Sequence, residues 1–84
     1  MKIIKFGKPG CEPCENVEKF LKQNEVDYTS INPYESEEFE LILKHKVTTV
    51  PVTVLVDTEG NELSRKAGYN EKALQHLINA YKDK

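Results

Sequence analysis

Cysteine and long apolar runs are scarce in this 84-residue sequence, and both shortages narrow what the protein can be. Two cysteines close at most one disulfide, so the chain is not one of the disulfide-rich scaffolds of small secreted proteins. No apolar run approaches the ~20 residues that cross a membrane. Residues 1–6 are too short and too charged to be the apolar core of a secretory signal, which takes about 7 to 15 residues. We therefore expect a cytoplasmic protein with no membrane contact.

A dominant charge of one sign is also missing. Twelve Lys and Arg residues stand against fourteen Asp and Glu residues, which gives a net charge of -2, and the basic residues are scattered. Nucleic-acid-binding domains concentrate positive charge on one face, so no nucleic-acid partner is expected. The composition, 38% hydrophobic and 31% charged, is typical of a folded domain. At this length we expect one domain over residues 1–84, acting as a monomer.

Hydrophobic periodicity divides the chain into alternating strands and helices. Short apolar runs rich in β-branched residues predict strands, and apolar residues three or four apart predict amphipathic helices. The pattern predicts strands at residues 3–6, 26–31, 52–56 and 61–67, and helices from just after Cys11 to Asn24, from Ser36 to about residue 46, and from about Asn70 onward. The order βαβαββα indicates an α/β fold. Its first βαβ unit places two parallel strands side by side with a right-handed crossover.

Both cysteines lie where the first predicted strand passes into the first helix. Cys14 falls on the apolar face of that helix, and Cys11 lies ahead of the helix body. Pro13 occupies the first turn, where its missing N–H costs nothing. The C-x-x-C spacing beside a βαβ unit is typical of thiol-disulfide exchange. The helix N-terminus favours a thiolate at Cys11, which is the predicted nucleophile, and Cys14 is the predicted resolving thiol.

A C-x-x-C pair can also be half of a metal site. A structural zinc needs four ligands, and the only further candidates, His45 and His76, lie far apart and outside any paired motif. We expect His45 at the C-terminal end of the second helix and His76 on the solvent face of the last one. No metal or cofactor is expected, and a metal or iron-sulfur carrier using Cys11 and Cys14 stays open as an alternative of another class.

The triplet Thr49-Val50-Pro51 stands immediately before the strongest predicted strand. Proline cannot donate to a strand ladder, so a strand start is its natural place. Together with Gly10-Cys11-Glu12-Pro13-Cys14, this triplet resembles the thioredoxin-fold redoxins, and the resemblance covers essentially the whole chain. The short lead before the cysteines and the Thr-Val-Pro triplet are similar to glutaredoxins. The hairpin of residues 56–68 is similar to thioredoxins.

The resemblance implies a thioredoxin fold, with a four-stranded mixed sheet in the order 2-1-3-4 flanked by three helices. It implies that Pro51 is a cis proline facing the disulfide, with Glu12 and Pro13 as supporting residues. The backbone of Val50 would pair with an extended substrate, a form of strand addition. The further substrate-binding residues that it implies are Thr49, Gly68 and Lys8.

Three positions depart from the patterns of these families. Glu12 places a carboxylate beside Cys11, which opposes thiolate formation. Lys5 stands where thioredoxins bury an acid that handles the proton of the resolving cysteine. The segment Ala67-Gly68-Tyr69-Asn70 replaces the glycines and acid that hold glutathione in many glutaredoxins, which leaves Lys8 as one partner for a glutathione carboxylate. We therefore predict a reductant of protein disulfides recharged by a thioredoxin-reductase-like enzyme, with a glutathione-dependent glutaredoxin as the alternative.

Overall fold

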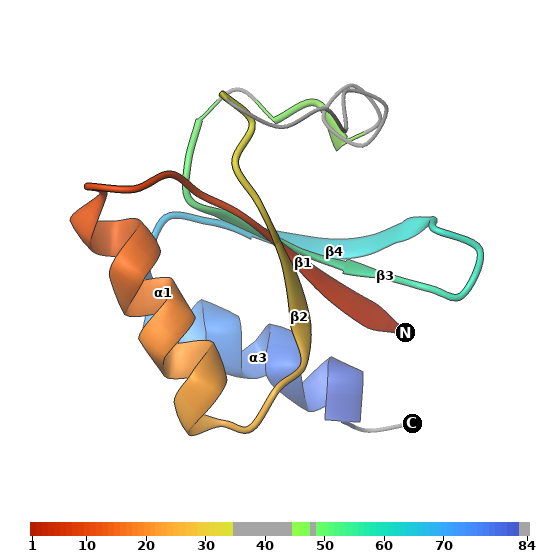
Figure 1. Cartoon of the computed structure of the whole chain (residues 1–84). Coiled ribbons are helices and arrows are strands. Elements are labelled where there is room, and N and C mark those ends of the chain that lie inside the picture. Colours follow the sequence, from red (N-terminus) through yellow and green to blue (C-terminus); the bar gives the residue numbers. More distant parts are fainter. Residues whose placement is uncertain (35–44, 48, 83–84) are drawn as a thin grey trace.

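The computed structural model describes residues 1–34, 45–47 and 49–82, which form a mixed sheet with helices (Figure 1). The strands are β1 (Lys2–Phe6), β2 (Tyr28–Ile31), β3 (Val52–Val56) and β4 (Glu62–Ala67), and the helices are α1 (Glu12–Gln23) and α3 (Glu71–Lys82). Strand β1 pairs in parallel with β2 and antiparallel with β3, which pairs antiparallel with β4. The predicted order 2-1-3-4 is confirmed. The predicted helix that begins at Ser36 lies outside the described residues, apart from its expected end.

Helices α1 and α3 lie on the same face of the sheet (Figure 1). Leu21 of α1 and Leu77 of α3 pack with Ile3 and Leu55 of the two central strands in one buried apolar cluster. Ile4 belongs to a second buried cluster, because successive strand residues point to opposite faces. Burial on both faces explains why apolar residues predominate in β1 and β3. Within the described residues, no helix has both the length and the apolar character that a membrane crossing requires.

Strand β2 begins at Tyr28, two residues later than the sequence pattern predicts. Helix α1 ends at Gln23 with Asn24 as its C-cap, and Glu25 takes a positive φ of 56° that turns the chain back. The N–H of Val26 then donates to the carbonyl of Leu21, at 3.1 Å. Val26 is therefore buried beneath the helix end instead of paired in the sheet. The sequence pattern placed it in the strand because a buried β-branched residue next to a strand has the same local signature as a strand residue.

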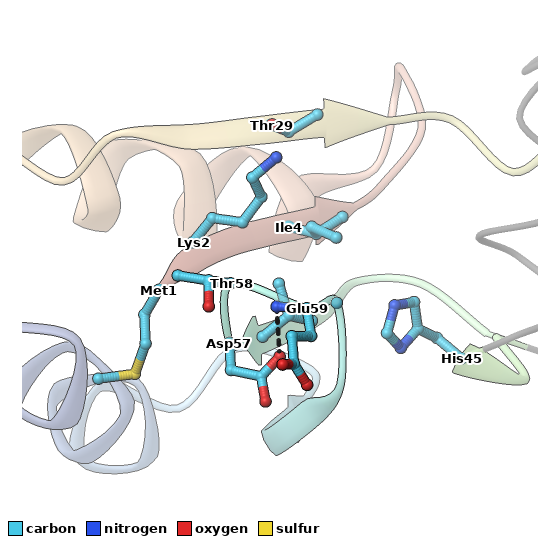
Figure 2. A pocket seen from close by; sticks show the side chains of 10 residues that line it. Met1, Lys2, Ile4, Thr29, His45, Asp57, Thr58 and Glu59 are labelled. Carbon is cyan, nitrogen blue, oxygen red and sulfur yellow. Dashed lines mark hydrogen bonds between the residues drawn. The ribbon is translucent and has the colours of Figure 1, made fainter.

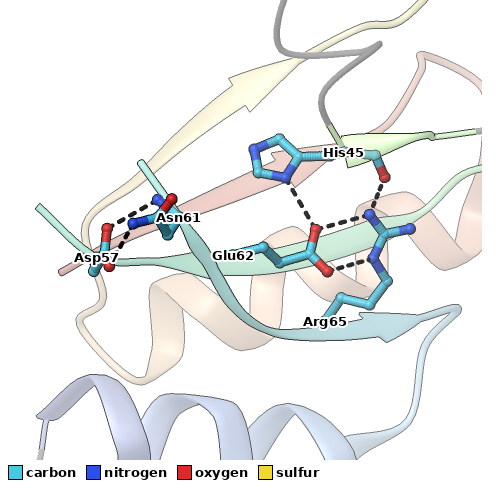
Figure 3. Close-up of polar contacts among 5 residues, drawn as sticks. All are labelled: His45, Asp57, Asn61, Glu62 and Arg65. Carbon is cyan, nitrogen blue, oxygen red and sulfur yellow. Dashed lines mark hydrogen bonds and ion pairs between the residues drawn. The ribbon is translucent and has the colours of Figure 1, made fainter. Parts of the chain in front are cut away.

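A polar network joins His45 to strand β4 (Figure 3). The sequence placed His45 only at the end of a helix, whereas the structure buries it, with Nδ1 3.0 Å from Oε1 of Glu62. Because a carboxylate only accepts hydrogen bonds, Nδ1 carries the hydrogen. Arg65 donates to both Glu62 oxygens and to the carbonyl of His45. The hydrogen bond from Arg65, with a smaller one from His45, lowers the pKa of Glu62.

This network predicts an acid-sensitive part of the stability. A carboxyl whose pKa is lower in the folded than in the unfolded protein stabilises the fold above its ordinary range, and this contribution disappears as the pH falls through the folded value. We expect Glu62→Gln to lower the free energy of unfolding by about 1 kcal/mol at pH 7 and by progressively less below about pH 4.5. Urea denaturation at several pH values measures the difference.

The matched control for this experiment is Glu59→Gln, which removes an equal charge from the exposed turn of the same hairpin. Its effect should stay within about 0.5 kcal/mol at every pH, as is usual for surface substitutions. Equal effects of the two substitutions across the pH range would show that general charge, and not the contacts of Glu62 with Arg65 and His45, sets the acid sensitivity.

Candidate active site

The two cysteines lie at the start of α1, directly after β1. Gly10, with a φ of 74°, makes the turn into the helix. Cys11 is the N-cap residue, with extended backbone angles, and its Sγ accepts a hydrogen bond from the N–H of Cys14 at 3.3 Å. The two residues form a disulfide, and their Cα atoms are 5.2 Å apart. Pro13 lies in the first helical turn, as predicted, and among the N–H groups of this turn that of Cys14 donates to the sulfur of Cys11.

Access to the two sulfurs is unequal. Cys14 lies on the buried face of α1 and is only 2% exposed, whereas Cys11 is partly exposed. Glu12 and Glu15 place two carboxylates in the first turn. These carboxylates stabilise the positive end of the helix and oppose a thiolate at Cys11. An accessible sulfur with a buried one in bonding range is the arrangement that dithiol exchange requires.

A groove of about 450 Å³ lies between the start of α1 and the loops before β3 and after β4. The Val50–Pro51 peptide bond is cis, and the carbonyl of Pro51 accepts a hydrogen bond from the N–H of Gly68 at 2.8 Å. Gly68 has a φ of 71°, which glycine adopts most readily. The groove brings together five residues predicted from the sequence and adds two more, and its lining consists of Glu12, Pro13, Asn16, Val50, Pro51, Gly68 and Tyr69.

Two predicted substrate-binding residues lie away from this groove. Thr49 is exposed and is not part of its lining. Lys8 lies over the ring of Tyr34, with Nζ 5.4 Å from the ring centroid. It lines a different cleft, which leads to Cys14. Lys8 and Pro51 thus line different clefts.

This second cleft, of about 250 Å³, is polar. Lys5 lines it and is only 6% exposed, with Nζ 3.7 Å from Oε2 of Glu18 and 5.9 Å from the ring centroid of Tyr28. The Tyr28 hydroxyl donates to Oε1 of Glu18 at 3.0 Å. This hydrogen bond, then a hydrogen bond from Lys22 and the charge of Lys5, lowers the pKa of Glu18. Burial, helped by the same hydrogen bond, raises the pKa of Tyr28 to about 12.

Glu18 and Tyr28 were not among the residues predicted for the site. One signal in the sequence could have found Glu18, because it follows Cys14 by four residues and therefore lies on the same side of the helix. Lys5, a lysine in an apolar strand, needs an opposite charge nearby. Glu18 supplies this charge one helical turn after Cys14, where α1 lies against β1. Tyr28 depends on the pairing of β2 with β1, which no local pattern reveals.

The described part of the chain contains no cluster of side chains that could bind a metal ion. No group of three or more His, Cys, Asp or Glu side chains lies close enough together there to hold an ion. His45 is buried against Glu62, and His76 is exposed on α3. Neither histidine joins Cys11 and Cys14 in such a group.

A larger hollow, of about 580 Å³, lies on the side of the sheet that carries Ile4 and Val56 (Figure 2). It is bounded by the start of β1, by Thr29, by His45 and by the turn of residues 57–60. In this turn, Oδ1 of Asp57 accepts hydrogen bonds from the N–H groups of Glu59 and Asn61. None of the residues predicted for the site lines this hollow, so the cysteine pair and its groove remain the candidate site.

Known proteins are similar to this chain over the region that carries the candidate site. The glutaredoxin family model matches residues 3–59, a segment that includes both cysteines and Pro51. The SPbeta prophage-derived thioredoxin-like protein YosR of Bacillus subtilis (strain 168) is 31% identical over 78 residues. The aligned region covers 93% of this chain and 95% of that protein.

Solved structures of redoxins share the fold. The crystal structure of the thioredoxin-like protein BC3987 has a TM-score of 0.69 at 28% identity, and the match covers 90% of this chain and 99% of that one. The NrdH-redoxin of Escherichia coli, a glutaredoxin-like protein with a thioredoxin-like activity profile, has a TM-score of 0.70 at 18% identity, over 92% of this chain and 95% of that one. This chain therefore belongs to the glutaredoxin family of thioredoxin-fold redoxins.

Proposed function

We propose that this protein is a thiol-disulfide oxidoreductase that reduces protein disulfides by dithiol exchange. The observation that carries the proposal is the unequal access of two linked sulfurs at a helix N-terminus, with Cys11 partly exposed and Cys14 2% exposed. In the reduced protein, the helix N-terminus stabilises a thiolate at the accessible position. Cys11 is therefore the nucleophile and Cys14 the resolving thiol.

The proposed reaction has two exchange steps. The Cys11 thiolate attacks the substrate disulfide, a Cys11–substrate bond forms, and one substrate thiolate leaves. Cys14 then loses its proton to solvent and attacks Cys11. The Cys11–Cys14 disulfide forms and the second substrate thiolate leaves. Two electrons have passed to the substrate, and its two thiolates take up protons from solvent.

Docking of the substrate is assigned to the groove beside Pro51. Its lining includes Val50, the residue whose backbone would add an extended substrate segment as a strand. Main-chain hydrogen bonds of this kind provide affinity without demanding a particular sequence. The exposed Glu12 and Tyr69 border the same groove and would contact residues on either side of the substrate disulfide.

Electrons are proposed to come from a thioredoxin-reductase-like enzyme. Glutathione would have to lie beside Pro51 with its charged ends held, and Lys8 lines the other cleft instead. Tyr69 adds a bulky ring to the groove where glutaredoxins that bind glutathione carry small residues. Dithiol exchange needs only the two sulfurs and a partner, so we propose no cofactor. We also propose that residues 1–84 form a single domain, which acts as a monomer in the cytoplasm.

A coupled assay of NADPH oxidation tests the donor. One disulfide substrate is offered with a thioredoxin reductase or with glutathione and glutathione reductase, at equal concentrations of this protein. We expect turnover to be several times faster with the thioredoxin reductase. The Cys11→Ser protein is the background control for both arms, and faster turnover with glutathione would assign the protein to the glutathione-dependent glutaredoxins.

A further inference from the structure

A lysine lies on the buried, helix-facing side of the central strand β1. Lys5 shares this side with Ile3 and is only 6% exposed. Its register neighbours are Ser30 on β2 and Thr53 on β3, so a row of polar residues crosses an otherwise apolar face. Oγ1 of Thr53 is buried and, within the described residues, has no hydrogen-bond partner. Such a row is costly in a core and calls for a reason.

The ion pair of Lys5 does not supply that reason by itself. Its partner is Glu18, with Nζ and Oε2 3.7 Å apart. Buried ion pairs are weak evidence for stability, because well-packed apolar residues of similar volume often serve equally well or better. Glu18 is also shared, since Tyr28 donates to it and Lys22 lies 3.3 Å away. The negative charge of Glu18 is therefore divided among three partners, and the positive charge of Lys5 is only partly compensated.

Cys14 also lies near Lys5. The backbone of Gly7 lies close to both side chains, and glycine has no side chain that would separate them. A Cβ at Gly7 would lie 3.4 Å from Cε of Lys5 and 3.5 Å from Sγ of Cys14. Cε of Lys5, the carbon that carries the ammonium group, and the buried sulfur of Cys14 therefore border the same small space. Both also line the second cleft, together with Lys8, Glu15 and Glu18.

We propose that Lys5, whose charge Glu18 compensates only in part, stabilises the thiolate of Cys14 during the resolving step. The proposal rests on the proposed function. In that step the thiol of Cys14 gives its proton to solvent through the second cleft, and its sulfur then bonds to Cys11 as the bond from Cys11 to the substrate breaks. An opposite charge within about 4 to 6 Å favours the ionised form of a group, more strongly where water is partly excluded.

The experiment follows the reduced protein as it reacts with one equivalent of dithiobis-nitrobenzoate. Attack by Cys11 releases a first coloured thiolate, and resolution by Cys14 releases a second, in a step independent of reagent concentration. We expect Lys5→Met to raise the pH midpoint of the second phase by about one unit and to leave the first phase unchanged. Because a less stabilised thiolate is more nucleophilic, the tenfold loss of thiolate should slow this phase only about threefold below the midpoint.

Three further variants separate charge from packing. Lys5→Arg keeps the charge and should restore the midpoint, whereas Lys2→Met removes the same charge from the exposed end of the same strand and should change nothing. Glu18→Gln should move the midpoint in the opposite direction, because it removes the negative charge that competes for Lys5.

The outcomes distinguish this inference from the proposed function. A normal first phase with an unmoved second phase in Lys5→Met overturns the inference alone, and so do shifts of equal sign in Lys5→Met and Glu18→Gln. Absence of any first phase in the parent protein would overturn the proposed function and the inference with it.

Discussion

Replacing Cys11 with serine should reduce the catalysed reduction of insulin disulfides to the rate of dithiothreitol alone, a loss of at least about a hundredfold. Cys11 is the accessible sulfur of the pair and the one that caps α1. A serine hydroxyl fits the same cap and keeps the hydrogen bond to the N–H of Cys14, so the fold should be retained while the nucleophile is lost. Turbidity of the precipitating insulin chains measures the rate.

Cys14→Ser is the matched variant, since it makes the same atomic change at the buried sulfur. The first exchange step remains possible, but the mixed disulfide on Cys11 is not resolved within the protein. We expect this variant to accumulate covalent complexes with substrates, visible by mass spectrometry and lost on addition of excess reductant. Equal accumulation in Cys11→Ser, or complexes attached through Cys14, would contradict the division of roles proposed for the two sulfurs.

Local patterns in the sequence were sufficient for the sheet and for the cysteine pair. The apolar run at Val52–Val56 and the turn residues that follow it predicted a hairpin, because a buried strand and a glycine-containing turn each have a local signature. The C-x-x-C motif located the start of α1, since a cap, a proline in the first turn and helical spacing agreed there.

Contacts between distant segments could not be predicted in the same way. Glu62 and Arg65 bind His45 across more than fifteen residues of sequence, whereas the sequence pattern predicted only that both lie on a strand at residues 61–67. Lys5 was recognised as unusual, but its pairing with Glu18 depends on how α1 crosses β1. Side-chain partners of this kind follow from the packing of elements, which periodicity within one element does not determine.

The apolar face of α3 provides the largest stability effect that we predict. Leu77 is 1% exposed and packs in the cluster that joins α1, α3 and the central strands. Truncating a buried leucine to alanine removes apolar contacts and leaves a cavity, at a cost of about 2 to 5 kcal/mol. A chain of this size has a total stability of about 4 to 12 kcal/mol. Leu77→Ala should therefore remove a large fraction of it and lower the Tm by at least about 10 °C.

Leu63→Ala makes the same chemical change on β4, at a side chain that is 54% exposed. Its cost should stay within about 0.5 kcal/mol, because little apolar surface is returned to water and no cavity forms. Urea denaturation followed by circular dichroism compares the two proteins, with similar m-values expected because the same surface unfolds in both. A loss below about 1 kcal/mol in Leu77→Ala, or equal losses in the two variants, would mean that α3 is not packed on the sheet as described.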